Sequence, residues 1–397
     1  MGFSKYFLSA IAGASVAYAA CSNSQTQTVQ NQGDADTVGS CPTFTGDVHI
    51  NANAGPTLDF GKIAKITGKL SMDTDSQLTT LSLNSLTNLG SLSLTNLTKL
   101  ATLQMPQLTT VGDMTLENLP ILGGWDFGTN LQQAGDVNIE NVQIADLGAI
   151  ATAKKLNSVT LSNCQFLQNI HFSVSEIDSV DIGPNNVQQG QNVSFLQLAT
   201  ATTLTFRNST IVNTPMLRNV SDTLSLIGNT FTSFGAQNLS WVGALVIASN
   251  PLVTNVSFPS LTNINGTHPT LDIQNNTDLT VIDGFPQLVD VANGDAIFAG
   301  NIKNLSLPKI TNIAGALTVD TTVQSFDCDP IHALKDKQIA KGDVNCQNGD
   351  AAPIGSSGSS PTSGSGGAAS SSKSAAPIEL PSFLTTGLFA ALLAFLA

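Results

Sequence analysis

Two pairs of carboxylates recur at matching positions of neighbouring sequence segments. Asp113 and Asp136 each come directly before a pair of apolar residues spaced two apart, and Glu117 and Glu140 each come directly after such a pair. Hydrolysis of a glycosidic bond requires two carboxyl groups about 5 to 9.5 Å apart, so these rows could serve a β-helical carbohydrate-active enzyme. However, no Lys, Arg or His joins either row, and the only basic neighbours, Lys154–Lys155, fall in an expected turn. We therefore interpret the rows as solvated strand edges and predict no catalytic residues. The enzyme remains the alternative.

The other chemically active side chains do not form a recognisable site. The histidines lie in different repeats: His49, His171, His268 and His332. The sequence contains no H-x-x-H, C-x-x-C or G-x-S-x-G motif and no glycine-rich phosphate loop, so we predict neither a metal nor a cofactor. Trp125 and Trp241 could each stack on a sugar ring, but a lone tryptophan in a stack of short repeats more often packs a turn.

The elements that would position these residues are short strands repeated about every 22 residues. Apolar residues recur in pairs two apart, which places both side chains on one face of a strand. The thirteen pairs begin at Val48, Leu70, Leu92, Met114, Val137, Val159, Val180, Leu204, Leu224, Leu245, Leu271, Ile297 and Leu317. A second short strand follows in each repeat, as in Leu78–Leu83, and the intervening segments are too rich in Thr, Ser, Pro and Gly for helices. We predict an all-β solenoid, a right-handed β-helix of about 13 coils.

Asparagines recur just past these strand pairs. Most follow the pair by two residues: Asn96, Asn118, Asn141, Asn163, Asn208, Asn275 and Asn301. Others come one place later: Asn185, Asn229 and Asn250. Inward asparagines at equivalent turns can hydrogen-bond the next coil's backbone and form a ladder. Asn96, Asn208 and Asn275 also lie in N-x-S/T sequons, but a buried side chain cannot carry a glycan. The better predicted N-glycosylation sites are Asn192, Asn219, Asn238, Asn255, Asn265 and Asn304.

Cysteine usage indicates an oxidising compartment. The five cysteines are Cys21, Cys41, Cys164, Cys328 and Cys346. We predict that the first two pair, that the last two pair, and that each disulfide staples a cap over one end of the stack. Cys164 would be a buried thiol; the alternative is one shuffled pair with a reactive thiol. The C-terminal cap should include a short helix within Phe326–Lys337, with an Asp at its N-cap and a Pro in its first turn.

The C-terminal residues have the order of parts of a GPI-attachment signal. Small residues from Gly364 to Ser372 are followed by a moderately polar spacer and then by the apolar run 383–397. This order of small acceptor, spacer and hydrophobic tail is the one that GPI attachment requires. We predict Ser370 as the acceptor, with the other positions from Gly367 to Ser372 as alternatives, and residues 371–397 as the removed propeptide. A tail anchor is the alternative, but a tail-anchored protein would not also carry a signal peptide.

The N-terminal residues have the features of a secretory signal peptide. Lys5 precedes an apolar run, and Ala17–Ala19 has the A-x-A pattern of a cleavage site, which predicts a signal over residues 1–19. Between the two signals we predict a repeat domain over residues 20–346 and a flexible Ser/Gly-rich stalk over residues 347–370.

The composition limits the partners of the protein. Its formal net charge is −13, and binding to nucleic acid needs clustered Lys and Arg, so nucleic acid is not an expected partner. Only 11% of the residues are charged, compared with about 25% in ordinary globular domains. Hydroxyl and amide side chains must therefore cover much of the surface, which suits many weak contacts with glycans or with other proteins.

These features together resemble the fungal GPI-anchored cell-surface family of the extracellular-mutant and sporulation-specific type, whose leucine-rich repeats are compared with receptor L domains. The resemblance rests on the signal, the opening Cys41–Ile50, phrases such as Phe258–Ile264, the Cys328–Cys346 cap and the Ser-rich anchor. It implies a non-catalytic surface glycoprotein that supports cell-wall organisation and integrity. Its expected location is the outer leaflet of the plasma membrane, through the GPI lipid, or the cell wall, with wall glycans or wall proteins as partners.

Overall fold

The computed structural model describes residues 21–73, 77–185, 189–266 and 270–349. All of them belong to one compact unit within residues 1–354. The predicted signal peptide, the predicted propeptide, Ser370 and nearly all of the predicted stalk lie outside the described residues, so these assignments remain predictions.

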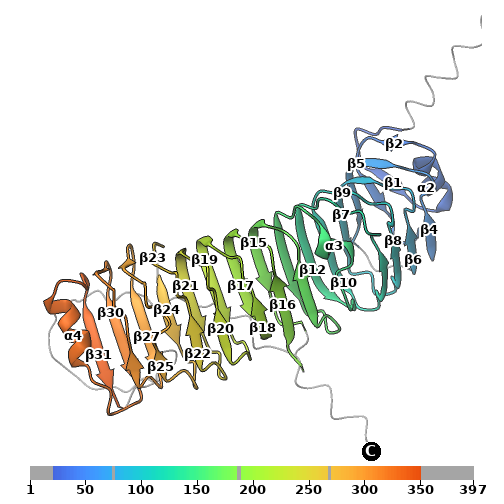
Figure 1. The fold of residues 1–397 in the computed structure, drawn as a ribbon. Coiled ribbons are helices and arrows are strands. Elements are labelled where there is room, and N and C mark those ends of the chain that lie inside the picture. The colour runs from blue at the N-terminus through green and yellow to red at the C-terminus, as the bar shows by residue number, and fades with distance from the viewer. Residues whose placement is uncertain (1–20, 74–76, 186–188, 267–269, 350–397) are drawn as a thin grey trace, which may run out of the picture. The chain divides into compact units, whose positions relative to one another are not determined.

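The described residues wind into successive coils, and the strands pair in parallel with equivalent strands of neighbouring coils (Figure 1). One side of the coils forms a 20-stranded sheet, which we call the main sheet. Its strands are β1 (Gln27–Val29), β2 (Thr43–Phe44), β3 (Val48–Ile50), β5 (Lys65–Met72), β7 (Asn88–Thr95), β9 (Thr110–Val111), β10 (Met114–Leu119), β12 (Asp136–Val142), β13 (Ser158–Ser162), β15 (Glu176–Ile182), β17 (Thr200–Arg207), β19 (Asn219–Ile227), β21 (Trp241–Ala248), β23 (Asn263–Ile264), β24 (Leu271–Gln274), β26 (Asp290–Val291), β27 (Ala296–Gly300), β29 (Asn312–Ile313), β30 (Leu317–Thr321) and β31 (Val344–Asn348).

The other side of the coils, which we call the opposite wall, carries four smaller sheets in the described residues. They contain β4 (Thr57–Asp59), β6 (Thr80–Ser82), β8 (Thr102–Gln104) and β11 (Gly124–Asp126); β14 (Asn169–Phe172), β16 (Gln191–Phe195) and β18 (Ser209–Asn213); β20 (Ser233–Gly235) and β22 (Asn255–Ser257); and β25 (Val281–Ile282) and β28 (Asn304–Leu305). The prediction of an all-β solenoid of about 13 coils is confirmed. The predicted second strand is present in most repeats but is missing between β11 and β14.

The inward-facing positions predicted from the repeat are correct except at one coil. The eleven predicted starting residues from Val48 to Leu271 are successive register partners across the main sheet. Leu271 then pairs with Ala296 and not with Ile297, and Ala296 pairs with the last predicted residue, Leu317. Ile297 therefore faces outward, one residue from its predicted position. The error arose because residues 296–299 are all apolar, so the sequence does not show which alternate residues face inward. The burial of the large Phe298 side chain selects the register.

In several coils a glycine allows the backbones of neighbouring coils to approach closely at the main sheet. A Cβ atom at Gly90 would lie 2.2 Å from the carbonyl oxygen of Thr67 in the preceding coil. A distance this short is not possible for a side chain, so only glycine allows the backbones of the two coils to approach so closely. The same close approach recurs at Gly112, where a Cβ would lie 2.0 Å from the carbonyl oxygen of Gly90.

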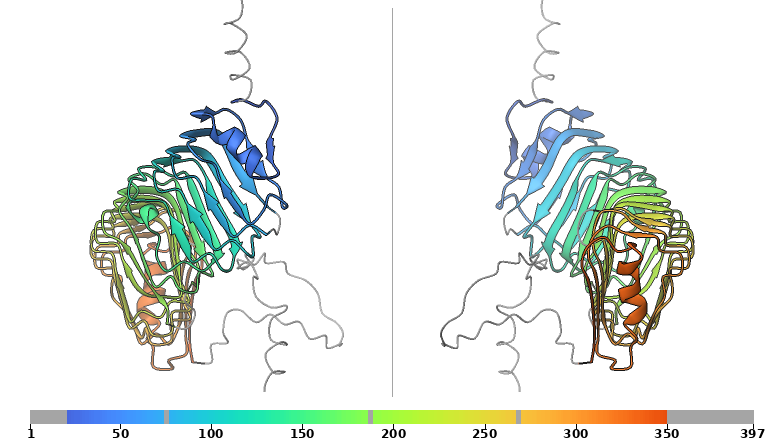
Figure 2. Two further views of the ribbon diagram at one scale, coloured as in Figure 1. Left: turned by 90° about the vertical axis from the view of Figure 1, so that its right-hand side faces the viewer. Right: turned by 90° about the vertical axis from the view of Figure 1, so that its left-hand side faces the viewer.

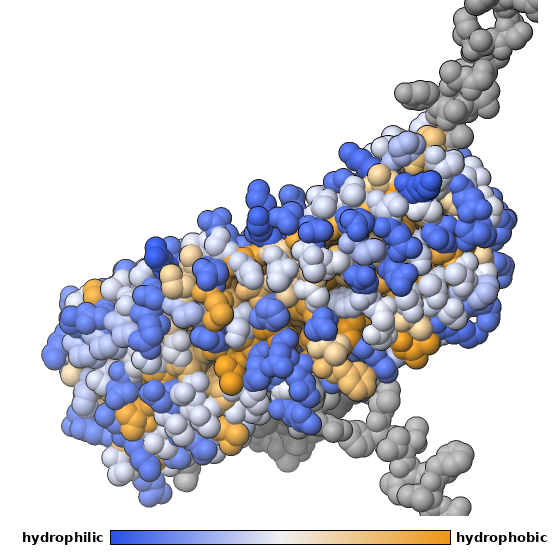
Figure 3. All heavy atoms as spheres, turned by 45° about the vertical axis from the view of Figure 1, so that its right-hand side comes forward, coloured by the Kyte–Doolittle hydropathy of each residue, from blue (hydrophilic) through white to orange (hydrophobic). Residues whose placement is uncertain are grey.

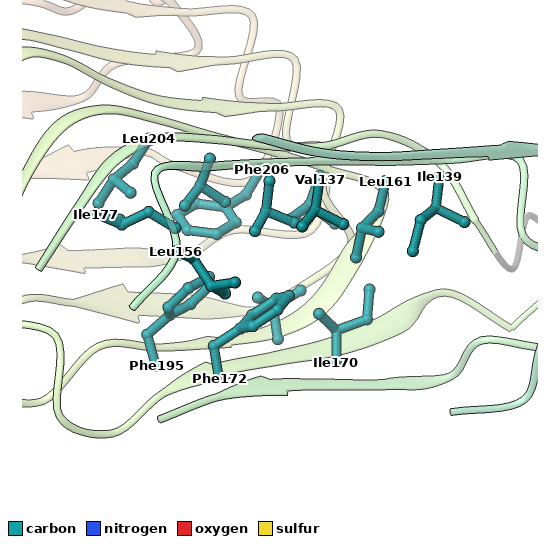
Figure 4. Close-up of a cluster of buried hydrophobic side chains, with 14 of the residues drawn as sticks. Val137, Ile139, Leu156, Leu161, Ile170, Phe172, Ile177, Phe195, Leu204 and Phe206 are labelled. Atoms are coloured by element: carbon teal, nitrogen blue, oxygen red, sulfur yellow. The ribbon is translucent and has the colours of Figure 1, made fainter. Parts of the chain in front are cut away.

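The core fills the space between the main sheet and the opposite wall. Figure 4 shows side chains such as Leu204 and Phe206 of the main sheet pointing toward Phe172 and Phe195 of the opposite wall. The Phe172 and Phe195 rings stack with centroids 5.0 Å apart. Because each fully buried side chain of this size contributes about 1.5 to 3 kcal/mol, the continuous row of such residues is the main stabilising feature of the stack.

Helices and disulfides lie at the two ends of the stack (Figure 2). Helix α2 (Gln32–Gly39), which the sequence analysis did not anticipate, begins after Asn31, whose side chain accepts a hydrogen bond from Asp34 N. A disulfide joins Cys21 and Cys41 on either side of this helix. A third, four-residue helix, α3 (Ala149–Thr152), interrupts the opposite wall.

The C-terminal helix, α4 (Asp329–Asp336), forms where it was predicted. Pro330 lies in its first turn, but the predicted aspartate N-cap is wrong: Cys328 occupies that position and its side chain makes no capping hydrogen bond. Asp327 lies one residue earlier, and its Oδ1 accepts a hydrogen bond from Asp329 N at 3.0 Å. In the described part of the chain, no helix has the length and apolar character needed to cross a membrane.

Candidate functional site

The aspartates of the first carboxylate row hold neighbouring coils together. Asp113 Oδ1 accepts a hydrogen bond from Asp136 N at 3.2 Å, and Asp136 Oδ1 accepts one from Ser158 Oγ at 2.8 Å. Asp47 and Asp295 do the same for Lys69 N and Ala316 N, at 2.8 and 2.7 Å. The row is thus one instance of a structural contact repeated along the stack.

The glutamates of the second row do lie side by side. Glu117 and Glu140 are register partners on β10 and β12, and both occupy the outer face of the main sheet. Asn138 Nδ2 donates to Glu117 Oε1 at 2.7 Å. Neither glutamate lines the cavity described below, and no described group of three or more His, Cys, Asp or Glu residues could hold a metal. The geometry therefore supplies two adjacent carboxylates on an open sheet surface.

The asparagines that follow the apolar pairs by two residues form a column at the surface. This outer asparagine column consists of Asn96, Asn118, Asn141, Asn163, Asn208 and Asn275, all with φ between 52° and 58°. Asn118 Nδ2 donates to Asn96 Oδ1 at 2.9 Å, and Asn141 Nδ2 donates to Asn118 Oδ1 at 2.9 Å. The prediction that these residues point inward is wrong, because the left-handed backbone, which asparagine tolerates, turns their side chains outward.

Because the outer asparagines are not buried, burial is no longer a reason to exclude three of them as glycosylation sites. Asn96 and Asn275 are exposed and Asn208 is half-buried, so burial does not exclude glycans at these positions. Of the six favoured sequon asparagines, five are exposed and Asn192 is half-buried. Asn192 Oδ1 also accepts a hydrogen bond from Thr210 Oγ1 at 2.9 Å. Glycosylation at all six positions stays a prediction.

The asparagines one place later are buried, as predicted for an inward ladder. This inner asparagine column consists of Asn185, Asn229, Asn250 and Asn276, which are at most 3% exposed. Asn250 shows the pattern: its Oδ1 accepts from Asn229 N at 2.8 Å, and its Nδ2 donates to Leu226 O at 2.9 Å. Each inner asparagine thus satisfies backbone groups of the preceding coil. In the first half of the stack Leu97, Leu119 and Val142 occupy this column instead.

Cys164 occupies the same inner column, between the apolar and the asparagine-bearing coils. Its thiol accepts from the backbone of Val142 and lies within donor distance of two carbonyl oxygens, Ser162 O at 3.4 Å and Ile139 O at 3.8 Å. The contacts with Val142 and Ile139 correspond to those of an inner asparagine. Asn185 Oδ1 in turn accepts from Cys164 N at 3.0 Å. The cysteine is free and buried, and desolvation by burial raises the pKa of its thiol from 9.0 to about 11. These contacts give Cys164 a structural role.

The outer face of the main sheet changes character along the stack, which the sequence analysis missed. Its outward positions are hydroxyl- and amide-bearing in the first half, but Val246 and Ile297 occupy them in the second. Asp272 lies between these two in register and is only 8% exposed. Burial raises the pKa of Asp272, which a hydrogen bond from Gln274 partly opposes. Figure 3 shows one face of the molecule, on which hydrophobic residues form small orange areas among polar ones.

The two tryptophans lie in different settings. Trp241 is half-buried at the start of β21, with Asn219 and Asn263 as its register partners on the outer face of the main sheet. Trp125 lies in β11 of the opposite wall and lines a cavity of ≈ 190 Å³. The prediction that a tryptophan packs a turn is therefore incomplete. The run Gly123–Gly128, with three glycines around an aromatic pair, was the available sequence signal for this cavity.

Comparison with known proteins identifies relatives over most of the chain. The family model described as "Ecm33: GPI-anchored cell wall organization protein" matches residues 1–38. Protein ecm33 of Aspergillus fumigatus is 32% identical over 377 residues, which cover 92% of this chain and 91% of the relative. A cell surface GPI-anchored protein of Arthroderma benhamiae is 30% identical, covering 87% of this chain and 88% of the relative.

A cell wall protein ecm33 of Schizosaccharomyces pombe is 29% identical, covering 80% of this chain and 75% of the relative. No solved structure matches the chain. The names of these relatives are those of cell-surface and cell-wall proteins. With 32% identity over nine-tenths of both chains, the protein belongs to the Ecm33 family of GPI-anchored cell wall organization proteins.

Proposed function

We propose that the protein supports the organisation and integrity of the fungal cell wall as a rigid, glycosylated and non-catalytic scaffold. A GPI lipid on Ser370 would hold it at the outer leaflet of the plasma membrane, from which the solenoid would contact wall glycans or wall proteins. The observation that carries this proposal is that the aspartates of the first row join neighbouring coils. One carboxylate oxygen of Asp113 and one of Asp136 each accept a hydrogen bond from the following coil.

The proposal is supported by the continuity of the stack. Successive coils share one core, so damage to one coil exposes the edges of its neighbours. A scaffold depends on that continuity, whereas an enzyme depends on a few reacting groups. The two kinds of function therefore differ in which substitutions they tolerate.

The test replaces the chromosomal copy by variants and measures growth on wall-binding dyes. Leu94→Asp and Leu226→Asp each place an unpaired charge at a fully buried position, at a cost of several kcal/mol, and should reproduce the dye hypersensitivity of a null strain. Asp113→Asn, Asp136→Asn, Glu117→Gln and Glu140→Gln should leave dye resistance nearly intact.

The side-by-side placement of Glu117 and Glu140 is the one observation that favours a second function, a carbohydrate-active enzyme acting on wall polysaccharide. If either amide variant is folded and anchored normally and yet reproduces the null phenotype, the enzyme becomes the better proposal.

The anchor is tested separately. Phosphatidylinositol-specific phospholipase C should release the wild-type protein from membranes, and a chain that ends before Phe383 should appear in the medium. Retention of that truncated chain on membranes would contradict GPI attachment while leaving the scaffold proposal in place.

A further inference from the structure

The opposite wall is interrupted between β11 and β14. Strand β11 pairs with β8 of the preceding coil, with Trp125 opposite Leu103. The next coil has no strand at the equivalent position, and its residues 144–148 instead lead into α3. The cavity of ≈ 190 Å³ lies at this interruption and is lined by segments 123–128 and 144–149. It is therefore a consequence of one missing strand in an otherwise regular wall.

An aromatic ring forms part of the cavity lining. Trp125 is partly exposed, and its ring packs edge-to-face on Phe127 with centroids 5.1 Å apart. Phe127 is 3% exposed and belongs to the core, so it fixes the orientation of the tryptophan. The face of an aromatic ring carries negative partial charge and attracts the partly positive C–H groups on the apolar face of a hexose.

Hydrogen-bonding groups lie beside this ring. Asp126 Oδ1 accepts from Gly128 N at 2.7 Å, and Asp146 Oδ1 accepts from Gly148 N at 2.8 Å. No described residue donates to the second oxygen of either carboxylate. In a parallel sheet, alternate residues of a strand direct their backbone N–H and C=O groups to opposite neighbours. Trp125 therefore directs its N–H and C=O away from β8 and toward the next coil, where no described backbone group bonds to them. The cavity thus offers several acceptors and one donor to a ligand.

Glycines keep the cavity open. A Cβ atom at Gly123 would have nothing within 4 Å, and one at Gly124 would make only ordinary contacts. Neither position needs a positive φ, so larger residues are conformationally possible there and would occupy space beside Trp125. Gly123→Leu is consequently a variant that fills the cavity without straining the backbone.

We propose that this cavity binds a single hexose unit of a neutral glycan, with the sugar stacked on Trp125 and its hydroxyl groups donating to Asp126 and Asp146. This proposal rests on the proposed function, because it places one of the wall-glycan contacts. The two carboxylates and the lack of a basic side chain among the lining residues disfavour an anionic sugar, so we assign a neutral one. The cavity volume of ≈ 190 Å³ lies below the 300–1,000 Å³ typical of sites for drug-sized ligands, which fits one sugar ring.

The test uses tryptophan fluorescence of the full-length protein carrying Trp241→Phe, in which Trp125 is the only tryptophan. The probes are a β-1,3-linked glucose trisaccharide, a mannose trisaccharide and an N-acetylglucosamine trisaccharide. At least one should produce a saturable change. Gly123→Leu in the same background should weaken that response at least tenfold, and a hexuronic acid trisaccharide should bind at least tenfold more weakly than the neutral sugar.

Three results would overturn the proposal: no saturable response to any neutral trisaccharide, a response that Gly123→Leu leaves unchanged, or a response to an extended peptide but to none of the sugars. The reciprocal variant Trp125→Phe, which retains Trp241, should give no response. The titration reports on the cavity directly and does not depend on the dye phenotype. If no sugar binds, the scaffold tests are unaffected, and if the scaffold tests fail, this binding measurement stays valid.

Discussion

Neighbouring coils are joined by surface asparagines in the first half of the stack and by buried asparagines in the second. In the first half Asn96, Asn118 and Asn141 bond to one another through their side chains, above an inner column of Leu97, Leu119 and Val142. In the second half Asn229, Asn250 and Asn276 lie in that inner column and bond to backbone groups as well. The same residue type thus joins coils in two ways that differ by one sequence position.

Burial, and not the number of hydrogen bonds, decides how much each asparagine column contributes to stability. A surface hydrogen bond replaces one to water and contributes little net stability, whereas a buried group left without a partner costs about 1 to 3 kcal/mol. The inner column should therefore be essential and the outer column nearly dispensable. Cys164 lies between the two arrangements, and its thiol contacts the Ile139 carbonyl as an inner asparagine would.

The largest expected effect is that of removing one inner asparagine. Asn250→Ala leaves two buried groups, Asn229 N–H and Leu226 C=O, without their partners, and it also leaves a cavity. We expect the free energy of unfolding to fall by roughly 3 to 5 kcal/mol, measured by urea titration. Ser260→Ala is the control, because Ser260 Oγ donates an exposed hydrogen bond to Gln237 O of the preceding coil, and it should cost less than about 1 kcal/mol. Similar losses in both variants would contradict the comparison.

Alkaline pH should have the next largest effect, through Cys164. Burial raises the pKa of its thiol from 9.0 to about 11 in the folded protein, so the folded state binds the proton more tightly than the unfolded state. This contribution to stability is complete below pH 9 and is lost as the pH rises to about 11, by about 1.4 kcal/mol per pH unit. Urea midpoints of the wild type and of Cys164→Asn should diverge over this window. Parallel curves above pH 9 would show that the thiol does not titrate with the fold.

The identity of residue 164 should matter by a smaller amount. Cys164→Asn can accept from Val142 N and donate to Ile139 O, as the inner asparagines do, whereas Cys164→Val can do neither. We expect the Asn variant to be more stable than the Val variant by about 1 kcal/mol at pH 7, although valine is the more hydrophobic residue. Thermal unfolding of both proteins tests this order. The reverse order would mean that position 164 belongs to the apolar part of the inner column.

The smallest expected effect is at the outer column. Asn118→Gly removes the side-chain bonds to Asn96 and Asn141 but keeps a residue that adopts φ near 54° without strain. Gly228 already occupies the equivalent position of a later coil, with φ 63°. The unfolding free energy should change by no more than about 0.5 kcal/mol. A loss of 2 kcal/mol or more would show that the surface ladder contributes as much as the buried one.

Most of the strand positions could be predicted because alternation is a local property. Leu92 and Leu94 are two residues apart and flanked by serines, so only one face can be the apolar one. Around Ile297 the residues on both faces of the strand are apolar, and there the register predicted from the local sequence was wrong. The candidate carboxylates were also found from spacing alone, but their role was not, because Asp113 bonds to the backbone of a residue 23 positions away.

The coil length, the inward-facing residues of most coils and the position of the C-terminal helix can be read from the sequence, since each depends on residues within one repeat. Which asparagine column is buried, and where the opposite wall is interrupted, became known only from the folded chain. Both depend on contacts between coils: the left-handed turn at Asn118 fixes the side chain relative to the next coil, and the cavity at Trp125 exists because the following coil supplies α3 in place of a strand. Such contacts join residues about 22 positions apart, so no pattern within one repeat reports them.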